Sequence, residues 1–149
     1  MTSLTLSIAS DHRGFQLKAL FVARIKELGH QAVDFGPNDE TRCDAGDFAQ
    51  KVALDLRAHP ERLGILICGS GQVMAMTANR YKHIRAALCT NATMARLARS
   101  HNNANILAIG AHIVGQEVAL DCLETFLSTP FLGGRYAERC DKMEELGGL

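Results

Sequence analysis

The stretch LGILICGSG, residues 63–71, decides the fold that the sequence predicts. Its first six residues form a nearly continuous apolar run, which is typical of parallel strands covered on both faces. Gly69 and Gly71 then turn the chain into a helical pattern that begins near Gln72. A buried strand, a glycine turn and a helix are the repeating elements of an α/β domain, so we expect a parallel sheet.

The same order of elements recurs on both sides of this stretch. Apolar spacing predicts five strands in all, at residues 4–8, 31–35, 63–68, 84–89 and 105–109. Helical spacing predicts helices over residues 15–28, from about 48 to the residue before Pro60, then over 72–80, 92–100 and 114–127, with a charged helix from about 135. The short connections between elements favour a parallel sheet with helices on both faces.

Length and composition exclude several classes of protein. The 149 residues, 47% of them hydrophobic, predict a single domain (1–149) with a sizeable core. Sixteen Lys and Arg balance sixteen Asp and Glu, so no net field draws in nucleic acid or an anionic membrane. No apolar run approaches a membrane span, and residues 1–10 do not resemble a secretory signal. Five cysteines without metal-ligand spacing predict reduced thiols in the cytoplasm.

Chemically reactive side chains follow several of the predicted strands. Asp11 and His12 follow the first strand, Cys68 ends the third, and His112 follows the fifth, while His101 ends a helix. Ligands of parallel sheets bind beyond the carboxyl ends of the strands. We therefore expect a site at that edge.

The loop after Cys68 is the strongest local signal. Its glycines allow a close approach of backbone to ligand, and the helix start that follows favours a phosphate or an enediolate oxygen. The same helix start favours a thiolate, which makes Cys68 a candidate base or nucleophile. The alternative is a buried thiol beside a plain tight turn. Met74 replaces the third glycine of a dinucleotide fingerprint, and no P-loop lysine follows, so nucleotide binding is disfavoured.

The other candidates also have structural alternatives. Asp11 could cap the first helix, and His101 could play a structural role at a helix end. Arg135 and Arg139 share a helix face and could hold one phosphate together, or they could pair with acidic neighbours such as Glu138. Spacing alone leaves these alternatives open.

Six stretches, in order over nearly the whole chain, resemble the ribose-5-phosphate isomerase B family, which includes the galactose-6-phosphate isomerase subunits. They are SDHRGF (10–15), GILICGSG (64–71), TANR (77–80), IRAALC (84–89), HNNAN (101–105) and GGR (133–135). The resemblance implies a Rossmann-like three-layer αβα sandwich with a five-stranded parallel sheet. It also implies a homodimer or tetramer with active sites between subunits, in which the C-terminal helix, about 133–148, packs on the partner.

The resemblance further implies an aldose–ketose isomerase of the pentose phosphate pathway, acting on ribose 5-phosphate through a cis-enediolate without metal or cofactor. Cys68 matches the base, Ser70 a proton shuttle, and Asp11 and His101 the residues that open the sugar ring. The implied substrate and phosphate ligands are His12, the loop residues Gly69, Gly71, Val73 and Met74 through backbone N–H groups, Asn102, His112, Arg135 and Arg139.

Five places depart from the family pattern. His112 replaces an arginine phosphate ligand; Val73 replaces a glycine, Ala75 a serine, Ala45-Gly46 a Tyr-Pro pair and Tyr136 a histidine. The proton-transfer residues are intact, so we expect isomerase chemistry. The alternatives are another C4–C6 sugar phosphate as substrate, a non-catalytic sugar-phosphate-binding paralogue, or a silent subunit of a hetero-oligomer.

Overall fold

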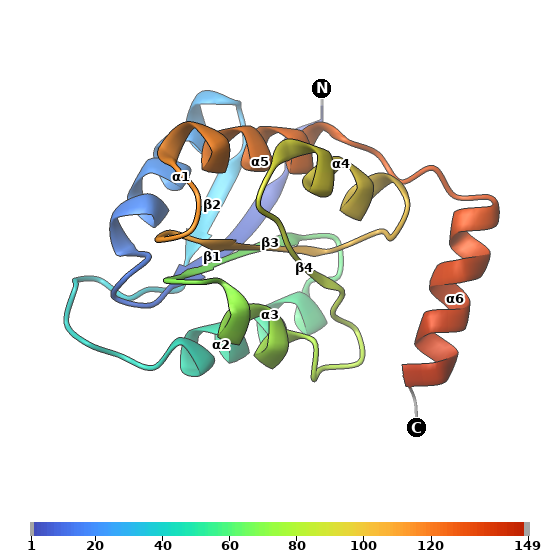
Figure 1. Cartoon of the computed structure of the whole chain (residues 1–149), viewed down its shortest axis with the longest axis horizontal. Helices are drawn as coiled ribbons and strands as arrows, with labels where there is room; N and C mark the ends of the chain where they lie inside the picture. The colour runs from blue at the N-terminus through green and yellow to red at the C-terminus, as the bar shows by residue number, and fades with distance from the viewer. Residues whose placement is uncertain (1, 148–149) are drawn as a thin grey trace.

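The computed structural model describes residues 2–147 and contains a five-stranded parallel sheet in the order β2-β1-β3-β5-β4 (Figure 1). The strands are β1 (Thr5–Ser10), β2 (Gln31–Asp34), β3 (Leu63–Cys68), β4 (Ala86–Leu88) and β5 (Ile106–Gly110). The helices are α1 (Phe15–Glu27), α2 (Ala45–Ala58), α3 (Gln72–Ala78), α4 (Ala92–Ser100), α5 (Gln116–Ser128) and α6 (Arg135–Gly147). The predicted α/β fold with a five-stranded parallel sheet is confirmed.

Helices cover both faces of the sheet, which explains the continuous apolar run of β3. On one face α1, α4 and α5 bury a core that includes Phe21, Ile65 and Phe126. On the other face α2 and α3 bury a second core that includes Leu66 and Met74. Alternate residues of β3 therefore enter different cores, and the three layers of the predicted sandwich are visible in Figure 1.

Most element boundaries differ from the predictions by one to three residues, and two of them, in β4 and α3, differ for reasons that lie outside local spacing. The strand expected over 84–89 is confined to Ala86–Leu88. The N–H of Ile84 turns back to the carbonyl of Tyr81 at 3.0 Å, and the N–H of Arg85 donates to the side chain of Asn105 at 2.7 Å. The helix expected over 72–80 ends at Ala78, where the N–H of Arg80 bonds the carbonyl of Thr77 in a tighter turn.

The strand order creates one crevice that can hold a ligand. β1 and β3 are neighbours, but the chain leaves them toward opposite sides of the sheet, so their carboxyl ends form a topological switch point. By contrast, α6 stands beside the body at the other end of the molecule (Figure 1). Within residues 2–147, no helix combines the length and apolar character needed to cross a membrane.

Candidate functional site at the carboxyl edge of the sheet

Cys68 ends β3 at the crevice, with its side chain 4% exposed. The backbone N–H of Gly71 donates to its Sγ at 3.1 Å, which stabilises negative charge on the sulfur. Gly71 has a φ of 77°, and a Cβ there would lie 2.6 Å from Cδ1 of Leu88 and 2.9 Å from the backbone C of Ile109. Only glycine fits, so the turn that aims this N–H at the sulfur is fixed by close packing.

The turn between β1 and α1 packs directly against the end of β3. The N–H of Asp11 donates to the carbonyl of Ile67 at 3.1 Å. Asp11 is 7% exposed, and its Oδ1 accepts from the N–H groups of Arg13 (2.9 Å) and Gly14 (3.0 Å), so it holds the turn that precedes α1, whose N-cap is Gly14. A Cβ on Gly14 would lie 2.6 Å from the Ile67 carbonyl oxygen. The start of α1 is therefore held tightly beside Cys68.

His12 and His112 flank this turn. Nδ1 of His12 accepts from the N–H of Cys43 at 3.3 Å, which ties the 38–44 loop to the site. The N–H of His112 donates to the carbonyl of Gly69 at 2.9 Å. Both histidines thus lie at the predicted edge, as do Asp11 and the Cys68 loop.

Sequence reasoning missed one residue, Arg13. A Cβ on Gly69 would lie 3.1 Å from Cδ of Arg13, 3.4 Å from its Nη1 and 3.7 Å from Nδ1 of His112. Arg13 and His112 therefore converge on the backbone of the residue that follows Cys68. The available signal was a cation directly after Asp11-His12 at the end of a strand.

Two hollows open on either side of His12 and Arg13. One, of about 380 Å³, lies between α1 and the start of α5; the other, of about 590 Å³, lies under the 42–46 loop. The first is also lined by Gln16, Leu17, Leu20, Glu40, Ala111, His112, Val114 and Gln116, and the second by Arg42, Cys43, Asp44, Ala45, Gly46 and Val73. Cys68 itself lines neither hollow; of residues 69–74, which follow it, only Val73 lines one, the larger hollow.

The remaining loop residues take different positions. Ser70 is half-buried, and its Oγ accepts from the N–H of Gln72 at 3.4 Å. Val73 is exposed and lines the larger hollow, whereas the Met74 side chain is fully buried in the core. Met74 can therefore offer a ligand only its backbone N–H, which is the contact that was predicted for it.

Four predicted site residues lie at the opposite edge of the sheet from Cys68 of the same chain. His101 and Asn102 precede β5, whereas Cys68 pairs with Gly110 at the far end of β5. With about 3.3 Å of rise per residue, β5 alone separates the two edges by about 13 Å. Arg135 and Arg139 lie on α6, which stands near the end of α4 (Figure 1). Within one chain, this group therefore does not join Cys68, and its part in a site between subunits, which the resemblance implies, stays a prediction.

These distant residues form a cluster of their own, built on Tyr136. The rings of His101 and Tyr136 stack with centroids 4.1 Å apart, and the guanidinium carbons of Arg135 and Arg139 lie 5.1 and 5.9 Å from the Tyr136 ring. The hydrogen bond from Arg135 Nη2 to the Tyr136 hydroxyl, at 3.2 Å, raises the pKa of that arginine. We call His101, Arg135, Tyr136 and Arg139 the basic cluster.

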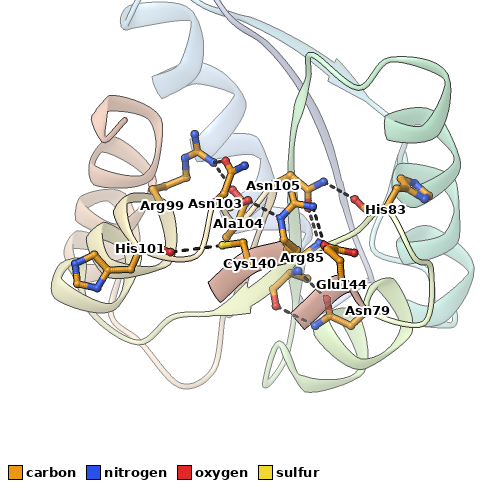
Figure 2. A network of polar contacts seen from close by, with 11 residues as sticks. Asn79, His83, Arg85, Arg99, His101, Asn103, Ala104, Asn105, Cys140 and Glu144 are labelled. Carbon is orange, nitrogen blue, oxygen red and sulfur yellow. Dashed lines mark hydrogen bonds and ion pairs between the residues drawn. The ribbon is translucent and has the colours of Figure 1, made fainter. Parts of the chain in front are cut away.

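A small set of polar contacts fixes the basic cluster to the body (Figure 2). Sγ of Cys140 donates to the His101 carbonyl at 3.6 Å, and Nη1 of Arg85 pairs with Oε1 of Glu144 at 3.2 Å. The backbone N–H of Arg85 donates in turn to Oδ1 of Asn105 at 2.7 Å. The cluster and α6 are thereby attached to the start of β5 and not to the Cys68 edge.

Other cysteines have surroundings that suit an inert thiol. Burial raises the pKa of Cys89 to about 12 and that of Cys122 to about 11. Burial, with a smaller effect of the carboxylates of Asp11, Asp44 and Asp39, raises the pKa of Cys43. All three are protonated at neutral pH, and Cys140 donates its S–H to the His101 carbonyl, so Cys68, whose Sγ accepts from an N–H, is the better candidate for a reactive sulfur.

Comparison with known proteins agrees with this geometry. Residues 6–143 match the family model described as Ribose/Galactose Isomerase. The chain is 37% identical over 143 residues to ribose-5-P isomerase B of Listeria innocua, covering 96% of this chain and 97% of the relative.

Two solved structures are also similar. Ribose-5-phosphate isomerase B of Clostridium thermocellum superposes with a TM-score of 0.94 at 41% identity, covering 97% of this chain and 98% of that one. The Mycoplasma genitalium enzyme, solved with bound ribulose-5-phosphate, gives a TM-score of 0.93 at 37% identity, with 99% of both chains covered. Because the match spans the sheet, the Cys68 loop and most of α6, this chain belongs to the ribose/galactose isomerase family.

Proposed function

We propose that the protein is an aldose–ketose isomerase that interconverts ribose 5-phosphate and ribulose 5-phosphate. The observation that carries this proposal is the Gly71 N–H donating to Cys68 Sγ beside two hollows lined by His12 and Arg13. A stabilised sulfur base next to cationic side chains suits proton transfer on a phosphorylated sugar. The similar Mycoplasma genitalium protein was solved with ribulose-5-phosphate bound, which favours this substrate pair.

The proposed reaction moves one proton between two carbons. The Cys68 thiolate removes the proton from C2 of the open-chain aldose, and the electron pair moves through C1 onto O1 to give a cis-enediolate. Backbone N–H groups of the loop from Gly69 to Met74 hold the developing oxyanion. The Ser70 hydroxyl relays a proton from O2 to O1, and Cys68 returns its proton to C1. Atoms and charge balance without any further reactant.

Completing the site requires a second subunit. We propose a homodimer in which the basic cluster and Asn102 of one chain reach the Cys68 edge of the other. His101, together with Asp11 of the chain that carries Cys68, then opens the sugar ring, and Arg135 and Arg139 join His12 and His112 around the phosphate. The exposed arginines on Tyr136, on a helix that stands beside the body, support this arrangement. Pairing of dimers into a tetramer is a further possibility of the same proposal.

The proposal also includes the cellular compartment and the pathway in which the reaction takes place. Five free cysteines support a reducing cytoplasm, and the substrate pair places the enzyme in the pentose phosphate pathway. A silent paralogue that binds without turnover is disfavoured, because the relatives carry the names of isomerases.

The substrate proposal is tested by incubating the protein with a panel of C4–C6 sugar phosphates in D₂O and following the C2 proton by NMR. We expect exchange and ketose formation with ribose 5-phosphate, and none with Cys68→Ala, which should still bind the sugar. Binding by the native chain without exchange would refute catalysis, and turnover of another sugar only would correct the substrate.

The shared site has its own test by subunit mixing. Cys68→Ala and His101→Ala homodimers should each be inactive. After unfolding and random reassociation, every mixed dimer carries one intact site, so the mixture should regain about a quarter of native activity. No recovery, with mixed dimers demonstrated by mass spectrometry, would contradict a site built from two chains.

A further inference from the structure

Arg13 occupies a position in the site that the proposed mechanism does not use. Its side chain is exposed and leaves the β1–α1 turn to lie against Gly69, where its Cδ and Nη1 are the atoms nearest to the place a Cβ would occupy. It borders both hollows, as His12 does. A ligand entering either hollow beside the Cys68 loop therefore meets the guanidinium.

The charge of Arg13 has no acidic side chain to neutralise it among residues 2–147. No ion pair involves it, although its backbone N–H donates to Asp11. Glu40 lines the smaller hollow, but its Oε1 accepts from Nε2 of Gln16 at 2.9 Å. Asp44 lines the larger hollow, where Arg42 also lies. The smaller hollow is thus lined by the guanidinium of Arg13, which has no ion pair, by the imidazoles of His12 and His112, and by the Glu40 carboxylate, which is hydrogen-bonded to Gln16.

The neighbour of Arg13 in that hollow is a weak phosphate ligand. His112, also beside Gly69, presents an imidazole, which offers one N–H or two on opposite sides of the ring and no forked pair of donors. A guanidinium is always charged and offers forked donors that match phosphate oxygens. Beside Gly69, Arg13 therefore offers a fixed charge and forked donors, which His112 does not.

We propose that Arg13 is a phosphate-binding residue of this chain, which supplies from the β1–α1 turn the fixed charge that position 112 does not provide. This inference rests on the proposed function for the identity of the sugar phosphate, but not for the binding of phosphate itself. Arg13 acts on binding and not on proton transfer, because it approaches the backbone of Gly69 while the Gly71 N–H holds the sulfur.

Arg13→Gln and Arg13→Lys test the proposal, with Arg57→Gln as the matched control because Arg57 is an exposed arginine that lines neither hollow. Loss of a charged, forked contact should raise KM for ribose 5-phosphate about 10- to 100-fold, with kcat changed less than about threefold. Arg13→Lys should recover part of the affinity, since it keeps the charge and loses the fork. Arg57→Gln should behave as the native chain does.

A binding measurement separates this proposal from the proposed function. Inorganic phosphate, titrated by calorimetry into the native chain and both Arg13 variants, reports phosphate affinity without turnover. Affinity that falls at least tenfold in Arg13→Gln supports the proposal even if ribose 5-phosphate proves to be the wrong substrate. Unchanged phosphate affinity and KM in a folded Arg13→Gln, or no phosphate binding by the native chain, would overturn it. Equal losses in Arg57→Gln would overturn it too, because they would indicate a general effect of positive charge.

Discussion

The turn at Gly71 allows the link between packing and chemistry to be tested with a matched pair of substitutions. Gly71 and Gly29 both adopt positive φ, at 77° and 85°. A Cβ at Gly29 meets no atom within 4 Å, whereas one at Gly71 meets Leu88, Ile109 and the N of Gly110 at 3.0 Å or less. Alanine at either site thus carries the same backbone strain, but only Gly71→Ala adds a clash.

The expected magnitudes follow from those contacts. A left-handed conformation costs a non-glycine residue about 1–2 kcal/mol, so Gly29→Ala should lower the free energy of unfolding by about that much. Overpacking against backbone adds about 1–3 kcal/mol at Gly71. Relief of the clash also moves the N–H away from Cys68 Sγ, and a displacement approaching 1 Å should cost about 100-fold in kcat.

Urea unfolding at one protein concentration and initial rates of ribose 5-phosphate isomerisation measure both effects. Gly29→Ala should be slightly destabilised and fully active. Gly71→Ala should be more strongly destabilised and nearly inactive at temperatures where it is still folded. If the two variants had equal stability and equal rates, the reasoning that close packing at Gly71 aims the donor at the sulfur would be refuted.

Two further predictions concern buried groups away from the site. Lys18, 2% exposed, donates to the Pro37 carbonyl and to Asp34, whose side chain is 42% exposed. Asp34→Ala leaves the buried ammonium with the Pro37 carbonyl as its acceptor and should cost about 2–3 kcal/mol, and Lys18→Met should cost distinctly less. Urea titrations compare them, and the reverse order of stabilities would contradict this view. Cys89 and Cys122, with pKa values of about 12 and 11, stay protonated below pH 10 and should resist iodoacetamide at pH 8 until the chain is unfolded. Peptide mass spectrometry after labelling checks this, and rapid labelling of either cysteine in the native protein would show that its surroundings open to solvent.

The sequence predicted those elements whose signals are local. The apolar run of β3 and the asparagine-capped α4 have the bounds that spacing indicated, and the Asn91 side chain does accept from the N–H of Met94. β4 is shorter than predicted because its first residues bond to the side chain of Asn105, which is distant along the chain. Local periodicity carries no information about such a partner.

In the site, too, the sequence predicted the positions that follow from local order and missed those that depend on packing between elements. Residues that directly follow strands, such as Asp11, His12 and His112, lie at the carboxyl edge because parallel strands end together there. His101 lies away from Cys68 within one chain because α4 runs antiparallel to the strands, so that its end returns to the amino edge. The contact of Arg13 with Gly69 could not be predicted, since it depends on how tightly α1 packs on β3 at Gly14.

The separation of the two groups has a consequence for how the enzyme can work. Each chain has a sulfur base and its donors at one edge of the sheet, and a set of exposed arginines on Tyr136 at the other. A rigid five-stranded sheet cannot bring these edges together. A two-fold interface can, because an isologous contact that carries one chain's basic cluster to the partner's Cys68 edge also carries the partner's cluster back. In the proposed dimer, Arg13 would belong to the subunit that holds the base, so cations from both chains would bind the phosphate and the sugar would be fixed relative to Cys68 only when the dimer is formed.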